Sequence, residues 1–386
     1  MKNLLFFLIF NLIIWLFIPK NVNAIENPLS VSNNKFGIHI LFPEELTEAA
    51  SLVNSNSGDW GYITIPIQAL DRDLIKWQKF MDDAKKHHII PLVRLSTEGD
   101  YFNTKVWRRP READILDFAN FLNSLNWPTK NRYIIVFNEV NRYDEWGESP
   151  DPGAYAELLS YAITTFKSKN QNFFIIQAGL DNASADVPGL SLNEYTYFRK
   201  MNEAVPGIFS RIDGLASHSY PNPGFFQSPF RSNSESVVSF RFEKELFKSF
   251  GANSDLPVFI TETGWSKNAL SDDIISVYYK EVFDSAWNSS DIVAITPFLL
   301  RAGSGPFTDF SFINSDGSKT HQYNVIKEIT KTKGQPALAD APLKNEPTIS
   351  PSSMPTRKFS EQKASENMKI EIPLGLKVFV RYLLKI

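Results

Sequence analysis

Residues 132–139 read RYIIVFNE and residues 256–262 read LPVFITE. In each stretch a short, nearly continuous apolar run ends in a polar residue followed by a glutamate. Such a run is typical of a strand that is buried on both faces in a parallel sheet. We therefore predict strands at 132–137 and 256–261. Similar runs after residue 35 predict six more strands, at 36–41, 62–67, 89–95, 173–177, 212–217 and 292–299.

Longer stretches with helical spacing separate these runs. Within residues 73–87, Trp77, Met81 and Ala84 recur at four- and three-residue steps, which places them on one face of a helix. The same reasoning predicts helices over 112–125, 152–167, 234–250 and 272–287. Eight strands that alternate with helices favour an α/β fold of the closed (β/α)₈ TIM-barrel type over an open sheet.

The turn after the first strand argues against the open sheet. That strand runs into Phe42-Pro43-Glu44, without the glycine-rich turn that a dinucleotide-binding sheet places at this point. The sequence therefore predicts no cofactor at this turn.

Residues 1–24 have the three parts of a secretory signal peptide. Lys2 supplies a positive charge, residues 4–18 form an apolar run interrupted only by Asn11, and the segment ends at the small residue Ala24. Because a membrane-spanning helix needs ~20 apolar residues, we expect a cleaved signal peptide rather than an uncleaved anchor. Either outcome predicts that the body of the protein is extracytoplasmic, secreted or at the cell surface.

Composition divides the remaining chain into a body and a tail. Residues 25–334 contain the alternating segments and are predicted to form one (β/α)₈ domain. Residues 335–369 are rich in proline, serine and lysine, which is typical of a disordered linker. Residues 370–386 are apolar with interspersed basic side chains. This last segment could lie on a membrane surface, pair with another chain or belong to a truncated module.

Composition also excludes several classes of protein and site. The net charge is −3, so the basic excess that usually marks a nucleic-acid-binding protein is missing. The chain has no cysteine, which excludes zinc–thiolate sites, disulfides and thiol nucleophiles. We expect a monomer that needs no cofactor.

Two glutamates follow buried strands at opposite sides of the predicted barrel. Glu139 ends the fourth strand and Glu262 ends the seventh. The active site of a (β/α)₈ barrel lies at the C-terminal ends of its strands. A charged group there is costly unless it is paired or functional, and a single such glutamate would be explained by a salt bridge. Two of them match the pair of carboxyl groups that glycoside hydrolysis requires on either side of one bond.

The motifs around these glutamates resemble those of clan A glycoside hydrolases, which are retaining (β/α)₈-barrel enzymes. Asn138-Glu139 is similar to the fourth-strand motif, and the TETGW string at residues 261–265 is similar to the seventh-strand motif. The resemblance covers roughly residues 36–332 in element order. It implies that Glu139 is the acid/base, that Glu262 is the nucleophile and that Asn138 holds the sugar 2-hydroxyl. The implied partner is a poly- or oligosaccharide.

The same resemblance suggests further substrate-binding residues. Clan members often carry a histidine or tyrosine near the nucleophile, a role that His218 and Tyr220 fit. Arg94 ends the third strand and is expected either to replace the second-strand arginine of the clan or to bind a loop carboxylate. Among the aromatic residues near strand ends, Trp146 and Trp265 are our candidates for stacking on a sugar ring.

A further aromatic position departs from the clan pattern. The eighth strand carries Phe298 where clan members often have a tryptophan that forms the sugar platform. This departure concerns the substrate geometry rather than the class of reaction.

Two other functions are alternatives to the glycosidase. A catalytically idle carbohydrate-binding protein on the same barrel would be favoured by the loss of either glutamate, and both are present. A metal-dependent barrel hydrolase needs clustered histidine and aspartate at strand ends. The chain has five histidines, His39 lacks a second histidine two residues on, and His87-His88 ends a predicted helix. We therefore expect no metal site.

Overall fold

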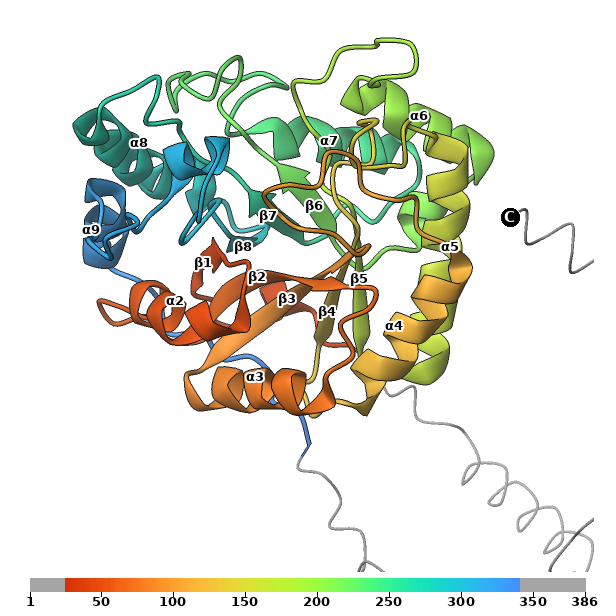
Figure 1. Cartoon of the computed structure of the whole chain (residues 1–386), viewed down its shortest axis with the longest axis horizontal. Helices are drawn as coiled ribbons and strands as arrows, with labels where there is room; N and C mark the ends of the chain where they lie inside the picture. Colours follow the sequence, from red (N-terminus) through yellow and green to blue (C-terminus); the bar gives the residue numbers. More distant parts are fainter. Residues whose placement is uncertain (1–24, 341–386) are drawn as a thin grey trace, which may run out of the picture. The chain divides into compact units, whose positions relative to one another are not determined.

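The computed structural model describes residues 25–340, and the predicted signal peptide and most of the predicted tail lie outside the described residues (Figure 1). It confirms the predicted (β/α)₈ barrel. The sheet has eight strands in the order β5-β4-β3-β2-β1-β8-β7-β6. The strands are β1 (Lys35–His39), β2 (Gly61–Gln68), β3 (Ile89–Ser96), β4 (Arg132–Val136), β5 (Phe173–Gln177), β6 (Leu215–His218), β7 (Val258–Glu262) and β8 (Ile292–Ile295).

The barrel closes between β5 and β6. One parallel bridge joins Ile176 to Gly214, just before β6, and a second joins Asp181, after β5, to His218 at the end of β6. The side-chain amide of Gln177 then continues the pairing, donating to the Ala216 carbonyl at 2.7 Å and accepting from the Ala216 amide at 3.1 Å. A buried glutamine side chain thus provides hydrogen bonds that the backbone ladder lacks at this seam.

Helices cover the outside of the barrel (Figure 1). The predicted helices are present as α3 (Leu74–Lys86), α4 (Glu112–Ser124), α5 (Pro152–Lys169), α7 (Ser239–Ser249) and α8 (Asp272–Asp284). The sequence did not predict α2 (Leu46–Val53), α6 (Glu194–Ala204) and α9 (His321–Glu328), which have 8, 11 and 8 residues. A helix of two or three turns shows too few apolar repeats for its period to stand out.

Two element boundaries differ from the prediction by four residues or more. Helix α7 begins at Ser239 rather than at residue 234, because Asn233 and Ser236 form a turn in which the Ser236 hydroxyl donates to the Asn233 carbonyl. Strand β8 ends at Ile295 rather than at residue 299. Pro297 has no amide hydrogen to donate to a neighbouring strand, which explains the early end.

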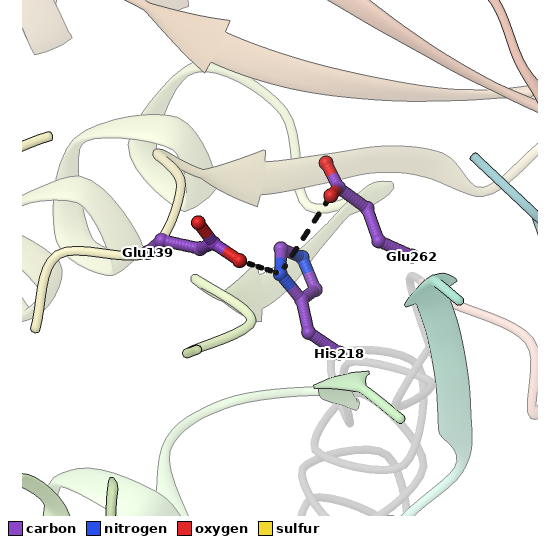
Figure 2. Close-up of side chains that lie close together, drawn as sticks. All are labelled: Glu139, His218 and Glu262. Carbon is purple, nitrogen blue, oxygen red and sulfur yellow. Dashed lines mark hydrogen bonds and ion pairs between the residues drawn. The ribbon is translucent and has the colours of Figure 1, made fainter. Parts of the chain in front are cut away.

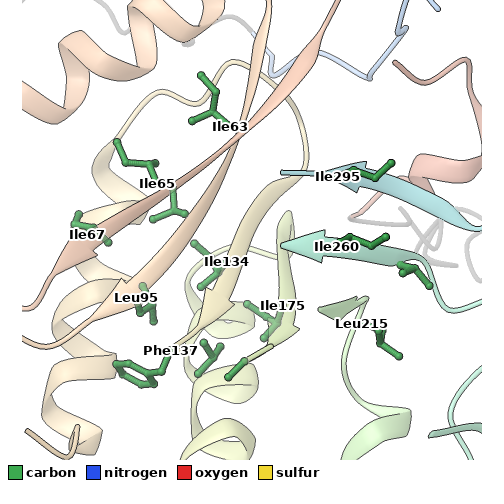
Figure 3. Packing of buried hydrophobic residues seen from close by; sticks show 14 of the residues in the cluster. Ile63, Ile65, Ile67, Leu95, Ile134, Phe137, Ile175, Leu215, Ile260 and Ile295 are labelled. Carbon is green, nitrogen blue, oxygen red and sulfur yellow. The ribbon is translucent and has the colours of Figure 1, made fainter. Parts of the chain in front are cut away.

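The strands carry two apolar faces, as their alternation requires. In β4, Tyr133 and Ile135 belong to the cluster that fills the barrel, while Ile134 and Val136 pack against the helices. Figure 3 shows the outward-facing set, which includes Ile65, Ile134 and Ile260. Because both faces are buried, the strands hold the polar residues at their C-terminal ends on a rigid frame.

The start of the predicted linker needs correction. Residues 335–340 contact the barrel instead of leaving it, since the Lys130 amide donates to the Ala337 carbonyl at 2.8 Å and Leu338 bridges Thr129. The pairing is made by backbone groups, which a composition argument does not detect. The domain therefore extends to about residue 340. None of the described helices is long and apolar enough to cross a membrane.

This boundary predicts the behaviour of two shortened chains. A chain of residues 25–340 should fold with a thermal midpoint close to that of the mature protein. A chain of residues 25–333 loses the backbone hydrogen bonds that residues 334–340 make with the barrel. It should melt roughly 5–10 °C lower, because about four such bonds are lost and each contributes about 1 kcal/mol. Scanning calorimetry of both chains measures the difference. If the 25–340 chain is insoluble while the longer chain folds, the tail packs on the barrel and the boundary is wrong.

Candidate active site

Glu139 is held in a strained turn just beyond β4. Phe137 and Glu139 have φ values of 71° and 36°, a left-handed conformation that residues other than glycine rarely adopt. The Glu139 amide donates to the Gly179 carbonyl at 2.9 Å, which fixes the turn against the end of β5. Strain of this kind persists only where the surrounding structure enforces it, and it is common at functional sites.

Glu262 is the last residue of β7 and is held by two side chains from other strands. Arg94 Nη1, from β3, donates to Glu262 Oε1 at 2.5 Å and also to Asn138 Oδ1 at 2.6 Å. The Tyr220 hydroxyl donates to Glu262 Oε2 at 3.2 Å. Only 8% of the Glu262 side chain is exposed. Arg94, at the end of β3, therefore binds the carboxylate of Glu262. Strand β2 has no arginine that could take this role.

His218 lies between the two glutamates (Figure 2). Its Nδ1 is 3.0 Å from Glu139 Oε1 and 3.9 Å from Glu262 Oε2. The imidazole packs directly on the backbone of Gly179, where an added Cβ would lie 2.2 Å from His218 Cδ2. Any side chain at residue 179 would therefore displace the ring that joins the two carboxyl groups.

The charges around this cluster set its protonation. Burial raises the pKa of Glu139, but the hydrogen bond from His218 and the charges of Arg142 and Arg94 outweigh burial and lower the pKa to about 2. Burial lowers the pKa of His218, while the Glu262 charge and the hydrogen bond to Glu139 outweigh it and raise the pKa. The cations around Glu139 therefore decide the direction in which its pKa moves.

These side chains open into a pocket of about 280 Å³ at the C-terminal end of the barrel. Its lining includes the charged residues Arg142, Asp144, Glu145 and Asp181. It also includes apolar and aromatic residues, which are Leu41, Tyr101, Trp107, Phe225, Phe298, Phe307 and Phe310. A small pocket with convergent polar groups and perturbed pKa values is the usual form of an enzyme active site.

No known family profile matches the chain, and a comparison with curated protein sequences finds no match. Among solved structures, a GH39 β-xylosidase from Caulobacter crescentus matches with a TM-score of 0.54 and 15% identity, over 80% of this chain and 73% of that one. GH5_18 from Streptomyces cattleya, in complex with GlcNAc, matches with a TM-score of 0.54 and 16% identity over 77% and 80%. The chain has the (β/α)₈-barrel fold of these proteins.

A third solved structure shows the same fold in a longer chain. It is a family 39 glycoside hydrolase from the gut symbiont Bacteroides cellulosilyticus WH2, with a TM-score of 0.52 and 16% identity over 78% of the present chain. The present chain spans 64% of that protein, which is less than two thirds of its length.

The barrel fold explains which predicted residues meet. Six of the eight site residues predicted from the sequence gather at its C-terminal mouth: Arg94, Asn138, Glu139, His218, Tyr220 and Glu262. They come from β3, β4, β6 and β7 and the residues that follow these strands, so only a closed barrel brings them together.

Both predicted sugar-stacking tryptophans need correction. Trp146 and Trp265 are 1% and 0% exposed and belong to the core between barrel and helices. Trp146 packs edge-on against Tyr155, and the Trp265 indole donates to the Gln227 carbonyl at 2.9 Å. The aromatic residues that do line the pocket include Trp107 and Phe298, the latter at the position where the clan often has tryptophan.

Several pocket residues were not predicted from the sequence. Arg142 Nη1 donates to Glu139 Oε2 at 3.1 Å, and its spacing of three residues from Glu139 was a usable signal. Burial and the Glu139 charge raise the pKa of Glu145 to about 8. His39 Nε2 lies 3.6 Å from Glu262 Oε1, and burial with the charge of Arg94 lowers the pKa of His39 well below its usual range.

Glu139, His218 and Glu262 also offer the donor atoms of a metal site. One ligand atom from each of Glu139, His218 and Glu262 lies within 4.8 Å of the others, a donor set that could accept a divalent ion. However, Arg94 and Arg142 already bind the two carboxylates as cations. Two guanidinium groups in direct contact with the ligands repel a divalent ion, so the site fits a metal poorly.

Proposed function

We propose that this protein is a retaining glycoside hydrolase that cleaves O-glycosidic bonds of an oligo- or polysaccharide by double displacement. The observation that supports this function best is the pair of buried carboxyl groups at the barrel mouth. One oxygen of Glu139 and one oxygen of Glu262 lie within 4.8 Å of each other. Retaining enzymes hold their carboxyl groups about 5–5.5 Å apart, whereas inverting enzymes need about 6.5–9.5 Å to admit a water molecule. We propose further that the protein acts after export.

In this proposal Glu262 attacks the anomeric carbon. Arg94 and Tyr220 orient its carboxylate, since both donate hydrogen bonds to it. Glu139 donates a proton to the leaving oxygen and then activates water to release the glycosyl group. Asn138, fixed by Arg94, is next to Glu139 and is the candidate for binding the sugar 2-hydroxyl.

Acid catalysis requires a proton in the Glu139–His218 pair. With the pKa of Glu139 lowered and that of His218 raised, this proton lies on His218 in the free protein. It can pass along the 3.0 Å hydrogen bond to Glu139 as the leaving oxygen takes a proton.

The activity should therefore fall as the pH rises through the raised pKa of His218, because above that pKa the pair has lost its proton. In His218→Asn only Glu139 can hold the proton, and the pKa of this carboxyl lies below that of His218, so the falling limb should move to lower pH by about one pH unit or more. The profile of kcat/KM against pH measures this shift. An unchanged alkaline limb in His218→Asn would show that the proton does not belong to this pair.

Retention of configuration is the direct test of the proposed mechanism. A panel of 4-nitrophenyl glycosides identifies a substrate that the protein turns over. Proton NMR of the first sugar released, recorded before mutarotation, should then show the anomer of the substrate. Release of the opposite anomer would exclude double displacement and the nucleophile role of Glu262. No turnover of any glycoside would favour the idle carbohydrate-binding protein instead.

A further inference from the structure

The loop after β8 crosses the barrel mouth and contacts the loop after β3. Phe307 packs on Phe102 with ring centroids 6.3 Å apart, and Gly303 of the same loop also lies against Phe102. Around the barrel, β8 and β3 are separated by β1 and β2. A contact between their loops therefore passes over the ends of those two strands and walls that side of the pocket.

Neighbouring side chains extend this wall on both sides. From the β1 loop, Phe42 packs edge-on against Tyr101 of the β3 loop at 5.9 Å. Towards β6, Phe310 packs against Phe225 at 5.2 Å. The Ser266 amide also donates to the Phe225 carbonyl at 3.0 Å, which ties the β7 loop to the β6 loop. The wall therefore runs from the β3 loop to the β6 loop, with Glu262 at its base.

The opposite side of the pocket is polar and open. Arg142 and Asp181 have side chains that are 36% and 24% exposed, while on the walled side Phe298 is buried and Phe307 and Phe310 are half-buried. These two charged residues are next to the acid/base candidate, since Arg142 binds both Glu139 and Asp181. The solvent side of the pocket thus lies beside Glu139, and the closed side lies beside Glu262.

This asymmetry determines in which direction a sugar chain can extend from the pocket. The sugar whose anomeric carbon is attacked lies on the Glu262 side, and the leaving group lies on the Glu139 side. A chain that continued beyond the attacked sugar would have to pass through the Phe102–Phe307 wall. The pocket volume of about 280 Å³ lies just below the range of roughly 300–1,000 Å³ for ligand sites, which leaves little room for further units.

We propose that the pocket accepts only the non-reducing end of a sugar chain, so that the protein releases terminal units, and that Phe102 and Phe307 determine this exo specificity. The proposal rests on the proposed function of a retaining glycosidase. The attacked sugar occupies the aromatic end of the pocket, and the rest of the substrate leaves past Arg142 and Asp181.

The test uses the mature protein and pentasaccharides labelled with a fluorophore at the reducing end. Xylopentaose, cellopentaose and laminaripentaose are the probes, and a panel of 4-nitrophenyl glycosides runs beside them. The labelled tetrasaccharide should be the first product and should exceed shorter labelled products by about tenfold or more. Labelled di- and trisaccharides as first products would overturn the exo specificity while leaving the glycosidase function intact. No hydrolysis of any probe would overturn the function, and the inference with it.

A pair of variants tests the role of the wall itself. Phe102→Ala combined with Phe307→Ala should open the β1–β2 side and raise the share of internal cleavage by roughly tenfold. Phe230→Ala is the matched control, because Phe230 is a 71% exposed phenylalanine outside the pocket lining. Exclusive tetrasaccharide release by a folded double variant would show that the wall does not set the specificity. Circular dichroism confirms folding, and the products of the unmodified protein remain a test if the variant does not fold.

Discussion

Replacing Glu262 with alanine is expected to lower kcat by at least about 10⁴-fold on every substrate, because the proposed reaction has no other nucleophile in reach of the anomeric carbon. The side chain is almost fully buried and is bound by Arg94 and Tyr220. A water molecule in its place would lack both the charge and the fixed position. Initial rates on the best 4-nitrophenyl glycoside measure the loss, and Glu44→Ala, which removes an exposed carboxylate of the β1 loop, is the control.

Covalent labelling separates loss of the nucleophile from loss of the fold. A 2-deoxy-2-fluoro glycoside of the preferred sugar should inactivate the protein and leave its glycosyl group on Glu262. Trypsin cleaves after Arg142, so peptides that carry Glu139 and Glu145 are distinguished from each other and from the Glu262 peptide by mass spectrometry. A label on Glu145 would contradict the assignment, since that carboxyl also lines the pocket.

The sequence predicted the two glutamates because each ends an apolar strand. A charge at that position is visible in a local pattern, and the barrel then fixes which strand ends meet. The two tryptophans show the limit of this reasoning. Trp146 and Trp265 both lie in segments that follow the ends of strands, yet both belong to the core. Proximity to a strand end along the chain does not indicate which way a loop turns its side chains.

The lining of the pocket depended on contacts that no local pattern contains. Phe307 comes from a loop that crosses two strands to reach Phe102, so its position is set by tertiary packing. The protonation of Glu139 likewise depends on His218, which is 79 residues away in the chain. The direction in which the pKa of Glu139 shifts depends on its neighbours in space. These neighbours cannot be read from the sequence, because they meet only when β4 and β6 lie in one barrel.

Glu139→Ala should produce a loss that depends on the leaving group. With an oligosaccharide, whose leaving alcohol needs a proton, we expect kcat/KM to fall by about 10²–10⁴-fold, the usual contribution of a general acid. With a 2,4-dinitrophenyl glycoside the leaving phenolate needs little protonation, so the first step should be nearly unaffected. Without a general base the second step becomes slow, and the glycosyl enzyme should accumulate and give a burst of phenolate.

Azide distinguishes this chemical role from a structural one. Glu139 is held between His218 and Arg142, so removing it leaves a small polar cavity beside two cationic groups. An azide ion fits such a cavity electrostatically and can attack the glycosyl enzyme without base catalysis. It should restore turnover of the activated glycoside and yield a glycosyl azide with the configuration of the substrate. Equal losses on both classes of substrate, with no azide product, would mean that Glu139 only maintains the geometry of His218 and that another group supplies the proton.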